Sequence, residues 1–264
     1  MCYNPNMRKN MKKNNRKPIT QNSELYFLSE VGKICPLCAD DLILTKNGKK
    51  TKNYEIAHIY PLNPTLQEKY ILRNCKKLSE DNDDDANKIA ICVKCHKQYD
   101  TEKTVEEYEK LYEIKKSILN KTSVSSILNK MQLEEAIDNI INTLCNMDKV
   151  KGIDLKTDAV RVENKIIDSL LCFKIKNYVR EYYKFVEKCF LDQNLTDQQT
   201  DNIMMTFRIA YNTAFDTYKQ NQTKIFESLV SWLEVKCGAN NKIACEIIIS
   251  YFVQHCEVFD DISK

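Results

Sequence analysis

The sequence predicts an α+β protein, with a small metal-stapled domain near its N-terminus followed by a mainly α-helical domain. Three observations support this prediction. Two Cys-x-x-Cys pairs, Cys35/Cys38 and Cys92/Cys95, lie in a stretch that is dense in turn signals. From Val105 onward, apolar residues recur at three- and four-residue steps, as they do in amphipathic helices. Only four Gly and five Pro occur in 264 residues, which favours long helices.

These differences in composition and periodicity predict four regions along the chain. Residues 1–20 are expected to form a basic, disordered tail, because they carry six Lys or Arg side chains and no acidic one, whereas the remaining residues sum to −3. Such a tail either adds salt-sensitive attraction to a phosphate backbone or is simply a solvated terminus. Residues 21–118 form the small domain, residues 119–130 form a linker that contains Ser and Thr, and residues 131–264 form the all-α domain.

Turn signals place the elements of the small domain. The stretches Leu42–Thr45 and Tyr54–Ile59 are expected to pair as a hairpin, because Asn47-Gly48 between them supplies the positive backbone angles of a tight turn. From about Asn87, apolar residues enter a helical spacing that places Cys92 to Tyr99 on one short helix.

The second half of the sequence predicts helix after helix. Residues 162–192 are expected to form one helix, Thr196 with Gln199 a capping box that opens the next, and Gly238 a helix stop. A last, strongly apolar helix runs from about Lys242 to Phe259. The apolar face of the helix over 162–192 comprises Ile167, Leu170, Leu171, Ile175, Tyr178, Val179, Tyr182, Phe185, Val186 and Phe190.

Composition also bears on the compartment. No apolar run is long enough to cross a bilayer, and the N-terminus has no hydrophobic segment like that of a signal peptide. We therefore expect a cytoplasmic protein without a membrane partner. In an intracellular chain, paired Cys-x-x-Cys units indicate metal rather than disulfides, and the other eight of the twelve cysteines stand singly.

The two cysteine pairs predict a structural zinc site. Cys35 with Cys38, and Cys92 with Cys95, would each clasp one side of a tetrahedral ion, and four thiolates define a closed Zn²⁺ site. A small unit with little apolar surface needs such a metal site, because its core alone contributes too little folding free energy and the bound metal adds to it.

The residues beside the cysteines are more specific. Two of only three histidines flank the pairs, in Glu55-Ile-Ala-His58-Ile and in Asn87-Lys-Ile-Ala-Ile-Cys92-Val-Lys-Cys95-His96-Lys-Gln-Tyr-Asp100. Over about residues 30–104, this order of His, Asn and His framed by both cysteine pairs resembles the HNH endonuclease family, which has a ββα-metal fold.

The resemblance implies hydrolysis of DNA phosphodiester bonds with a catalytic divalent cation. His58 matches the general base of the family, Asn87 the residue that fixes the loop and helps to orient that histidine, and His96 a ligand of the catalytic cation. The chemistry requires an activated water and a cation that stabilises charge on the phosphate. The ligand types suit Mg²⁺, Mn²⁺ or Ni²⁺.

One position departs from the family pattern. Many members have Asp directly before the general base as a metal ligand, whereas this chain has Ala57. Asp100 is the first replacement candidate, because it lies four residues after His96 on the same helix face. Glu55 is the second candidate, although strand alternation places it on the opposite face from His58.

Structural interpretations remain open for each of these residues. His58 could be a buried structural histidine, His96 a zinc-finger residue, and Asp100 a helix cap or the partner of Lys97 or Lys103. His255, in the last apolar helix, has no ligand-like neighbours and is expected to be structural.

The helical half has a resemblance of its own, over about residues 130–264. Its segments 162–166, 174–179, 182–183 and 244–259 look like the C-terminal domain of effectors in ABC-three-component antiphage systems. The resemblance implies that this half docks onto a middle-component protein and an ABC-type ATPase that sense infection, and that it holds the nuclease inactive until triggered.

Two other functions are compatible with the sequence. A stand-alone restriction-type HNH nuclease would read DNA through its helical half and needs a basic helix face there, where the charge is mixed. A non-catalytic zinc-binding module would bind nucleic acid or protein, with the helical half serving interaction.

Overall fold

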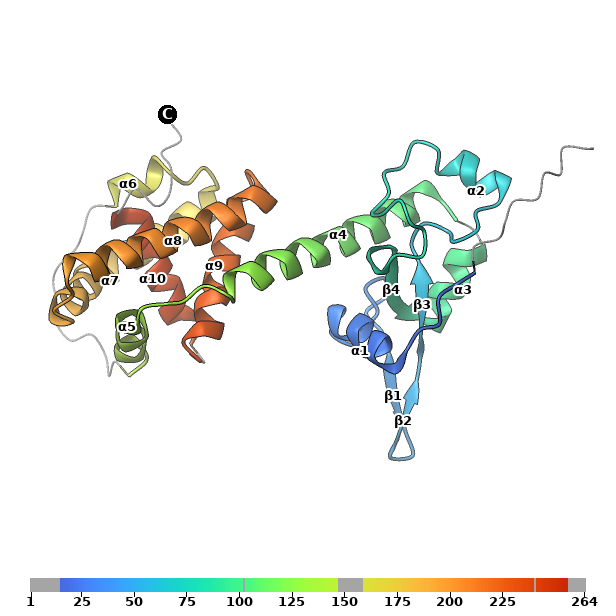
Figure 1. Ribbon diagram of the computed structural model, residues 1–264, viewed down its shortest axis with the longest axis horizontal. Helices are drawn as coiled ribbons and strands as arrows, with labels where there is room; N and C mark the ends of the chain where they lie inside the picture. Colours follow the sequence, from blue (N-terminus) through green and yellow to red (C-terminus); the bar gives the residue numbers. More distant parts are fainter. Residues whose placement is uncertain (1–14, 102, 147–158, 240, 256–264) are drawn as a thin grey trace, which may run out of the picture. The chain divides into compact units, whose positions relative to one another are not determined.

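The computed structural model describes residues 15–101, 103–146, 159–239 and 241–255, and the chain divides into two compact units, 1–119 and 120–264 (Figure 1). Unit 1 has two small sheets and short helices, and unit 2 is helical, so the α+β prediction is confirmed. Unit 1 contains α1 (Gln21–Glu30), β1 (Ile43–Lys46), β2 (Lys49–Lys52), β3 (Tyr54–His58), α2 (Leu66–Ile71), the 3-10 helix η1 (Asp85–Asn87), β4 (Lys88–Cys92) and α3 (Val93–Thr101). Helix α4 (Val105–Leu128) runs from unit 1 into unit 2, which also contains α5 (Glu135–Cys145), α6 (Val160–Glu163), α7 (Ser169–Asp192), α8 (Asp197–Tyr218), α9 (Gln222–Lys236) and α10 (Lys242–His255).

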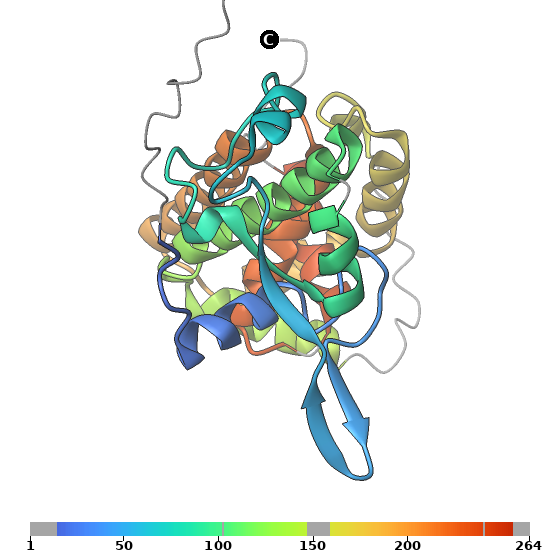
Figure 2. The ribbon, with the colours of Figure 1, turned by 90° about the vertical axis from the view of Figure 1, so that its right-hand side faces the viewer.

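The predicted tight turn is present, but it joins a different pair of strands. Asn47 and Gly48 have φ of 49° and 74° and join β1 to β2. A two-residue loop fixes the pairing register, so Lys46 lies opposite Lys49 and the hairpin ends at Lys52. The strand expected to pair with β1, β3, instead pairs with β4 in a second antiparallel sheet. The β1–β2 hairpin projects from the rest of unit 1 (Figures 1 and 2).

The predicted short helix begins later than expected. Residues 88–92 form β4 and are all buried, whereas helix α3 starts at Val93 and carries Cys95 to Tyr99 as predicted. The β-branched residues Ile89 and Ile91 suit a strand whose two faces are both covered. Helix α3 packs on β3 and β4, while α1 packs on β4.

Residues 15–20 of the predicted basic tail have defined partners, whereas residues 1–14 lie outside the described part of the chain. Arg16 donates to the carbonyl of Ile56 at 2.6 Å, and the amide of Lys17 donates to Asp83 Oδ2 at 2.7 Å. Thr20 caps α1. The charge composition of this segment favours disorder, and composition does not reveal these specific hydrogen bonds.

The predicted linker 119–130 is largely helical. Its residues 119–128 continue α4, because they include neither Gly nor Pro and their apolar side chains keep helical spacing. Val124 and Leu128 are buried in the core of unit 2.

In unit 2, α10 is the central helix. It packs against α5, α6, α7 and α9, and apolar side chains cover nearly all of its circumference, which is typical of a buried helix. Eleven of its 14 residues are buried. It begins at Lys242 as predicted, whereas its predicted end at Phe259 lies outside the described residues. No helix in the described ranges is both long and apolar enough to cross a membrane.

The helix expected over 162–192 is interrupted. Helix α6 ends at Glu163, and Asp168 then caps α7 by accepting from the amides of Leu170 and Leu171. The early part of the predicted apolar face is therefore not core, since Ile167 and Leu170 are 71% and 81% exposed.

Two other predictions for the helical half are confirmed. The capping box of Thr196 and Gln199 opens α8. Gly238 has φ of 56° just after α9, as expected of a helix stop.

Candidate functional site

Four cysteines meet at one point of unit 1. The Sγ atoms of Cys35, Cys38, Cys92 and Cys95 all lie within 4.8 Å of one another, and those of Cys38 and Cys92 are 3.6 Å apart. Tetrahedral zinc with Zn–S bonds of about 2.3 Å separates its sulfurs by about 3.8 Å. The donor set and its spacing therefore fit a structural zinc ion.

Two local structures bring the cysteine pairs together. The first is a tight loop in which the Ala39 amide donates to the Cys35 carbonyl at 2.8 Å, with Ala39 at φ 64°. The second is the junction of strand and helix, where Cys92 ends β4 and Cys95 lies in the first turn of α3. Because α3 starts at this junction, the cysteine cluster fixes the position of the helix against the sheet.

Backbone amides donate hydrogen bonds to the cysteine sulfurs. The Cys92 amide donates to Cys35 Sγ at 3.4 Å, and the Cys95 amide donates to Cys92 Sγ at 3.4 Å. Burial raises the pKa of Cys35, but N–H donors, among them those of Cys92 and Leu37, more than offset it and lower that pKa to about 7. A lowered pKa favours the thiolate of Cys35, which is the form that binds metal, whereas burial and the neighbouring thiols raise the pKa of Cys95.

His96 lies between two carboxylates. Its Nδ1 contacts Glu55 of β3, and its Nε2 is 3.3 Å from Asp100 Oδ2, one turn further along α3. The side chains of Glu55 and Asp100 are about half exposed, so solvent ions reach them. Lys103, with its Nζ 4.0 Å from Asp100 Oδ1, adds a cation beside the pair.

His58 has a different set of neighbours. Its Nε2 lies 2.9 Å from Asp83 Oδ1, and the two side chains are only 11% and 6% exposed. Lys88, which is opposite His58 in the sheet, reaches the same carboxylate oxygen at 3.1 Å. Burial lowers the pKa of His58, the cations of Arg16 and Lys88 lower it further, and Asp83 opposes them.

Asn87 locks the loop between β3 and β4. Its side-chain oxygen accepts from the Tyr60 amide at 2.8 Å, and its amide group donates to the carbonyls of Tyr60 and Asn82 at 2.8 and 2.7 Å. Its backbone carbonyl accepts from Ile59, directly after His58. The side chain of Asn87 thus bonds to backbone groups, and it acts on the chain around His58 rather than on the imidazole.

The structure gathers the expected residues into two groups, each with one member on β3. Glu55 belongs to the group of His96 and Asp100, while His58 stands with Asp83. The rise of a β-strand places the Cα atoms of Glu55 and His58 about 10 Å apart. Among the residues with described side chains, no hydrogen bond or ion pair joins the two groups.

Sequence reasoning missed Asp83, Lys88 and Arg16. The acidic run 81–85 indicates only a turn in the sequence, and the register that sets Lys88 opposite His58 depends on the β3–β4 pairing. A usable signal is present for one of them, because Asp83 stands four residues before Asn87, in the loop that Asn87 holds.

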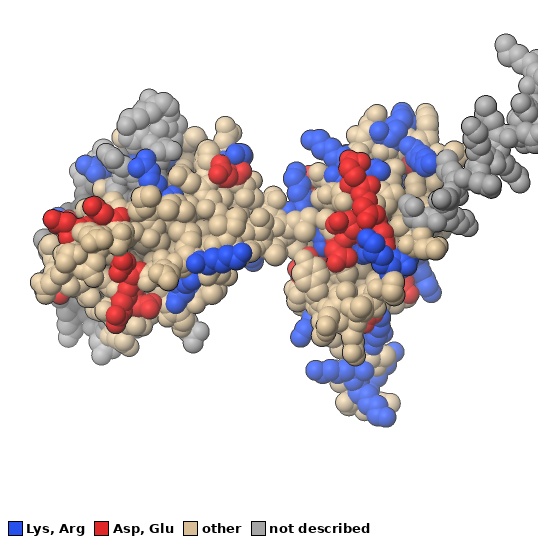
Figure 3. Space-filling model, in the orientation of Figure 1, with Lys and Arg blue, Asp and Glu red and all other residues tan. Residues whose placement is uncertain are grey.

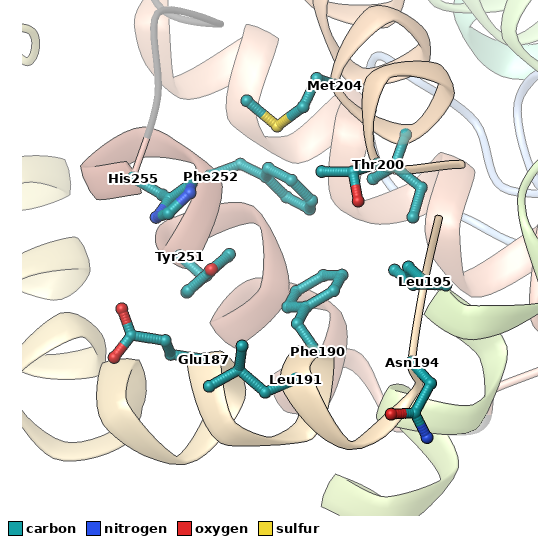
Figure 4. A pocket seen from close by; sticks show the side chains of 11 residues that line it. Glu187, Phe190, Leu191, Asn194, Leu195, Thr200, Met204, Tyr251, Phe252 and His255 are labelled. Carbon is teal, nitrogen blue, oxygen red and sulfur yellow. The ribbon is translucent and has the colours of Figure 1, made fainter. Parts of the chain in front are cut away.

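Unit 2 has a pocket of about 380 Å³ between α7, α8 and α10 (Figure 4). Phe190, Tyr251 and Phe252 form its aromatic wall, with Glu187 and His255 at one end. His255 Nδ1 is 2.8 Å from the Tyr183 hydroxyl, and its ring stacks on Tyr251. These contacts match the structural role expected for His255.

One known family matches the chain, and the match lies within unit 2. The family model for C-terminal domain 11 of the ABC-three-component (ABC-3C) systems matches residues 124–259, slightly more than half of the chain. The match covers helices α5 to α10 and the end of α4. No curated protein and no solved structure showed significant similarity to the chain.

Proposed function

Because the chain belongs to the family defined by C-terminal domain 11 of the ABC-3C systems, we propose that it is the nuclease effector of such an antiphage system. In this proposal, unit 1 is an HNH-type endonuclease that cuts DNA with a divalent cation. Unit 2 is the part that engages the other components, a middle-component protein and an ABC-type ATPase. The family supports the association with an ABC-3C system, and the nuclease activity rests on the arrangement of unit 1.

The observation that carries the nuclease proposal is the position of His96. It directly follows the cysteine cluster on α3, with Asp100 beside Nε2 and Glu55 beside Nδ1. A metal-ligating histidine commonly holds its ion with one ring nitrogen and donates the other N–H to a carboxylate. We therefore assign Nε2 and Asp100 to a divalent cation, with Glu55 as the residue that orients the ring.

The two carboxylates therefore have different roles. Glu55 is a candidate for direct metal ligation in the sequence, but its contact with Nδ1 suits an outer position better. Asp100 then replaces the carboxylate that Ala57 cannot supply. A bound divalent cation would stabilise charge on the scissile phosphate and on the leaving oxygen.

His58 is the proposed general base. It ends β3, which also carries Glu55, so the base and the residue that orients His96 share one strand. Burial lowers its pKa below the ordinary value, so that the imidazole is neutral and ready to accept a proton at pH 7. The strand order β3, β4 and then α3 is the order that a ββα-metal site requires.

DNA is the proposed substrate on grounds of charge. Lys46, Lys49, Lys50 and Lys52 lie on the β1–β2 hairpin, where every residue of β2 is exposed (Figure 3). Residues 42–54 contain no acidic side chain. A projecting hairpin of this charge suits contact with a phosphate backbone, which gives affinity without sequence readout.

The two alternative functions differ in their support. The restriction-type nuclease needs a DNA-reading helical half, whereas residues 124–259 match a domain of ABC-3C systems. The non-catalytic zinc module draws on the near burial of His58 and its pairing with Asp83, which would also suit a structural histidine. A nicking assay distinguishes such a module from a nuclease.

The test is nicking of supercoiled plasmid by the zinc-loaded chain, alone and with the ATPase and middle component of the proposed system. We expect nicking with Mg²⁺ or Mn²⁺ and none without a divalent cation. Single-stranded DNA and RNA serve as parallel substrates. If no substrate is cut in any combination, the nuclease proposal is wrong. If the tagged chain fails to co-purify with either component, the docking role of unit 2 is wrong.

A further inference from the structure

The environment of Asp83 is unusual for a carboxylate in a surface loop. Its side chain is 6% exposed and receives three donors: the Lys17 amide at 2.7 Å on Oδ2, and His58 Nε2 at 2.9 Å with Lys88 Nζ at 3.1 Å on Oδ1. Its own amide donates to Asp81 at 2.9 Å, which holds the loop in shape. The carboxylate is therefore fixed from the N-terminal segment, from β3 and from β4.

We propose that Asp83 is the positioning residue of His58: it holds the imidazole with Nε2–H toward its carboxylate and so presents Nδ1 to the attacking water. This inference rests on the proposed nuclease function and adds to it a residue that no sequence motif marked.

The protonation states follow from the contacts. Burial raises the pKa of Asp83, but the donors of Lys17, His58 and Lys88 more than offset it and lower that pKa to about 2. An ionised carboxylate only accepts hydrogen bonds, so His58 Nε2 must carry the proton in their contact. Neutral His58 then has its lone pair on Nδ1, and no residue with a described side chain hydrogen-bonds to that atom.

Three charged groups face His58 from the elements around it: Asp83 from the loop, Lys88 from β4 and Arg16 from the N-terminal segment. Arg16 is anchored by the carbonyl of Ile56 at 2.6 Å, two residues before His58 on the same strand. The two cations disfavour the imidazolium that forms during the reaction, while Asp83 stabilises it. Asp83 is thus the one anion among the three groups that supports proton uptake.

Asp83 supports the attack of water on the phosphate. Nδ1 of His58 takes a proton from water, the water oxygen forms a bond to phosphorus, and the bond from phosphorus to the leaving oxygen breaks. The leaving oxygen takes up a proton from solvent, and the imidazolium later releases its proton to solvent. Asp83 stays ionised throughout and orients the ring, as the carboxylate does in a Ser-His-Asp triad.

The test uses histidine ring signals of the full zinc-loaded chain labelled with ¹⁵N-histidine. Only three histidines occur, and His58→Ala identifies the signals of His58. We expect the Nε2–H tautomer in the neutral wild type. In Asp83→Asn we expect the pKa of His58 to fall by about 1 unit or more, because an opposite charge has been removed, and the nicking rate to fall on the order of 10²-fold.

Asp85→Asn is the matched control. Asp85 is 65% exposed and its side chain pairs with Lys88 at 3.3 Å, and it contributes none of the hydrogen bonds that His58 or the Asp83 carboxylate makes. We expect this variant to leave the tautomer and the pKa of His58 unchanged. Zinc content shows whether each variant has folded.

Two results would overturn the proposal: an Nδ1–H tautomer in wild type, or a His58 pKa that is the same in Asp83→Asn and wild type. The first measurement needs no variant, so the proposal stays testable if Asp83→Asn does not fold. Neither measurement requires cutting. A chain that cuts no DNA but shows the Nε2–H tautomer and the pKa shift would refute the nuclease function and retain the His58–Asp83 pairing.

Discussion

His96 Nε2 lies 3.3 Å from Asp100 Oδ2, one helical turn away on α3. The i, i+4 spacing brings the two side chains onto one face of the helix. This pair forms the core of the proposed divalent-cation site, because it combines an imidazole nitrogen with a half-exposed carboxylate directly after the cysteine cluster.

The proposed cation site predicts that Asp100 and Glu55 contribute unequally to the affinity for Mn²⁺. Asp100→Asn should weaken Mn²⁺ binding by about 10-fold or more, because a direct ligand is removed. Glu55→Gln should weaken it less, because an outer partner only orients the ring. Mn²⁺ titration followed by electron paramagnetic resonance measures both. Glu80→Gln, an exposed carboxylate outside the site, is the control, and equal affinities in all four proteins would refute the assignment.

The cysteine cluster predicts that zinc supports the fold of unit 1. Cys95→Ser should lower the zinc content below one ion per chain and lower the unfolding temperature of unit 1, because metal binding contributes directly to folding. Cys145→Ser, an exposed cysteine of α5, should change neither quantity. Metal analysis and calorimetry provide the readouts. Full stability of Cys95→Ser without bound metal would contradict a structural zinc site.

The hairpin predicts that its lysines supply salt-dependent DNA binding. Replacement of Lys46, Lys49 and Lys50 by Ala should weaken duplex binding. The slope of log K against log salt should become shallower by about 1 for each phosphate that is no longer neutralised. Binding is measured in the His58→Ala background to prevent cutting.

The matched control for the hairpin is the triple replacement of Lys110, Lys116 and Lys121 on α4, which removes the same charge. An equal decrease in affinity in both triples would show that only net charge matters. In that case the hairpin is not a DNA-contacting surface.

The neutral form of His58 predicts the acid side of the pH profile. Burial lowers the pKa of His58 below its ordinary 6.5, so the native state binds fewer protons there than the unfolded chain does. The nicking rate should therefore rise with pH through a midpoint below 6.5 and be flat at pH 7. The stability contribution of neutral His58 is present above pH 6.5 and is lost as the pH falls through the folded-state pKa. A midpoint above 6.5 would contradict a buried neutral base.

Asp83 predicts a second change in stability at lower pH. Its pKa of about 2 lies below that of an unfolded Asp, so its stabilising contribution is complete above about pH 4 and is lost as the pH falls toward 2. Asp83→Asn should flatten the acid unfolding curve of unit 1 in this window. An acid unfolding curve identical to that of wild type would show that the carboxylate adds no stability.

Local signals in the sequence are reliable where the chemistry is local. The Asn47-Gly48 turn, the capping box of Thr196 and the stop at Gly238 each depend on a few neighbouring residues, and all three are present. The pairing of β3 with β4 was missed, since about thirty residues separate the strands and periodicity does not report a distant partner. The break before α7 was missed for a similar reason, because Asp168 looks like one polar residue within an apolar pattern.

The site residues also divide into those that local sequence predicts and those whose position depends on the fold. The four cysteines are predicted to meet, and they do, because paired Cys-x-x-Cys spacing is a strong signal. The proximity of Asp100 to His96 follows from helical spacing. Strand alternation separates Glu55 from His58, but it also turns Glu55 toward α3 and His96. Asp83 was not identified, because its position beside His58 depends on the folded loop.

The most direct test of the nuclease function of unit 1 is the rate of plasmid nicking. This rate is measured for wild type, for His58→Ala and for His255→Ala with supercoiled plasmid. All three proteins are used zinc-loaded, with Mg²⁺ or Mn²⁺ and with the partner components present. We expect wild type and His255→Ala to nick at similar rates and His58→Ala to be slower by on the order of 10²-fold or more. Equal nicking by His58→Ala and wild type, or none by wild type, would contradict this function.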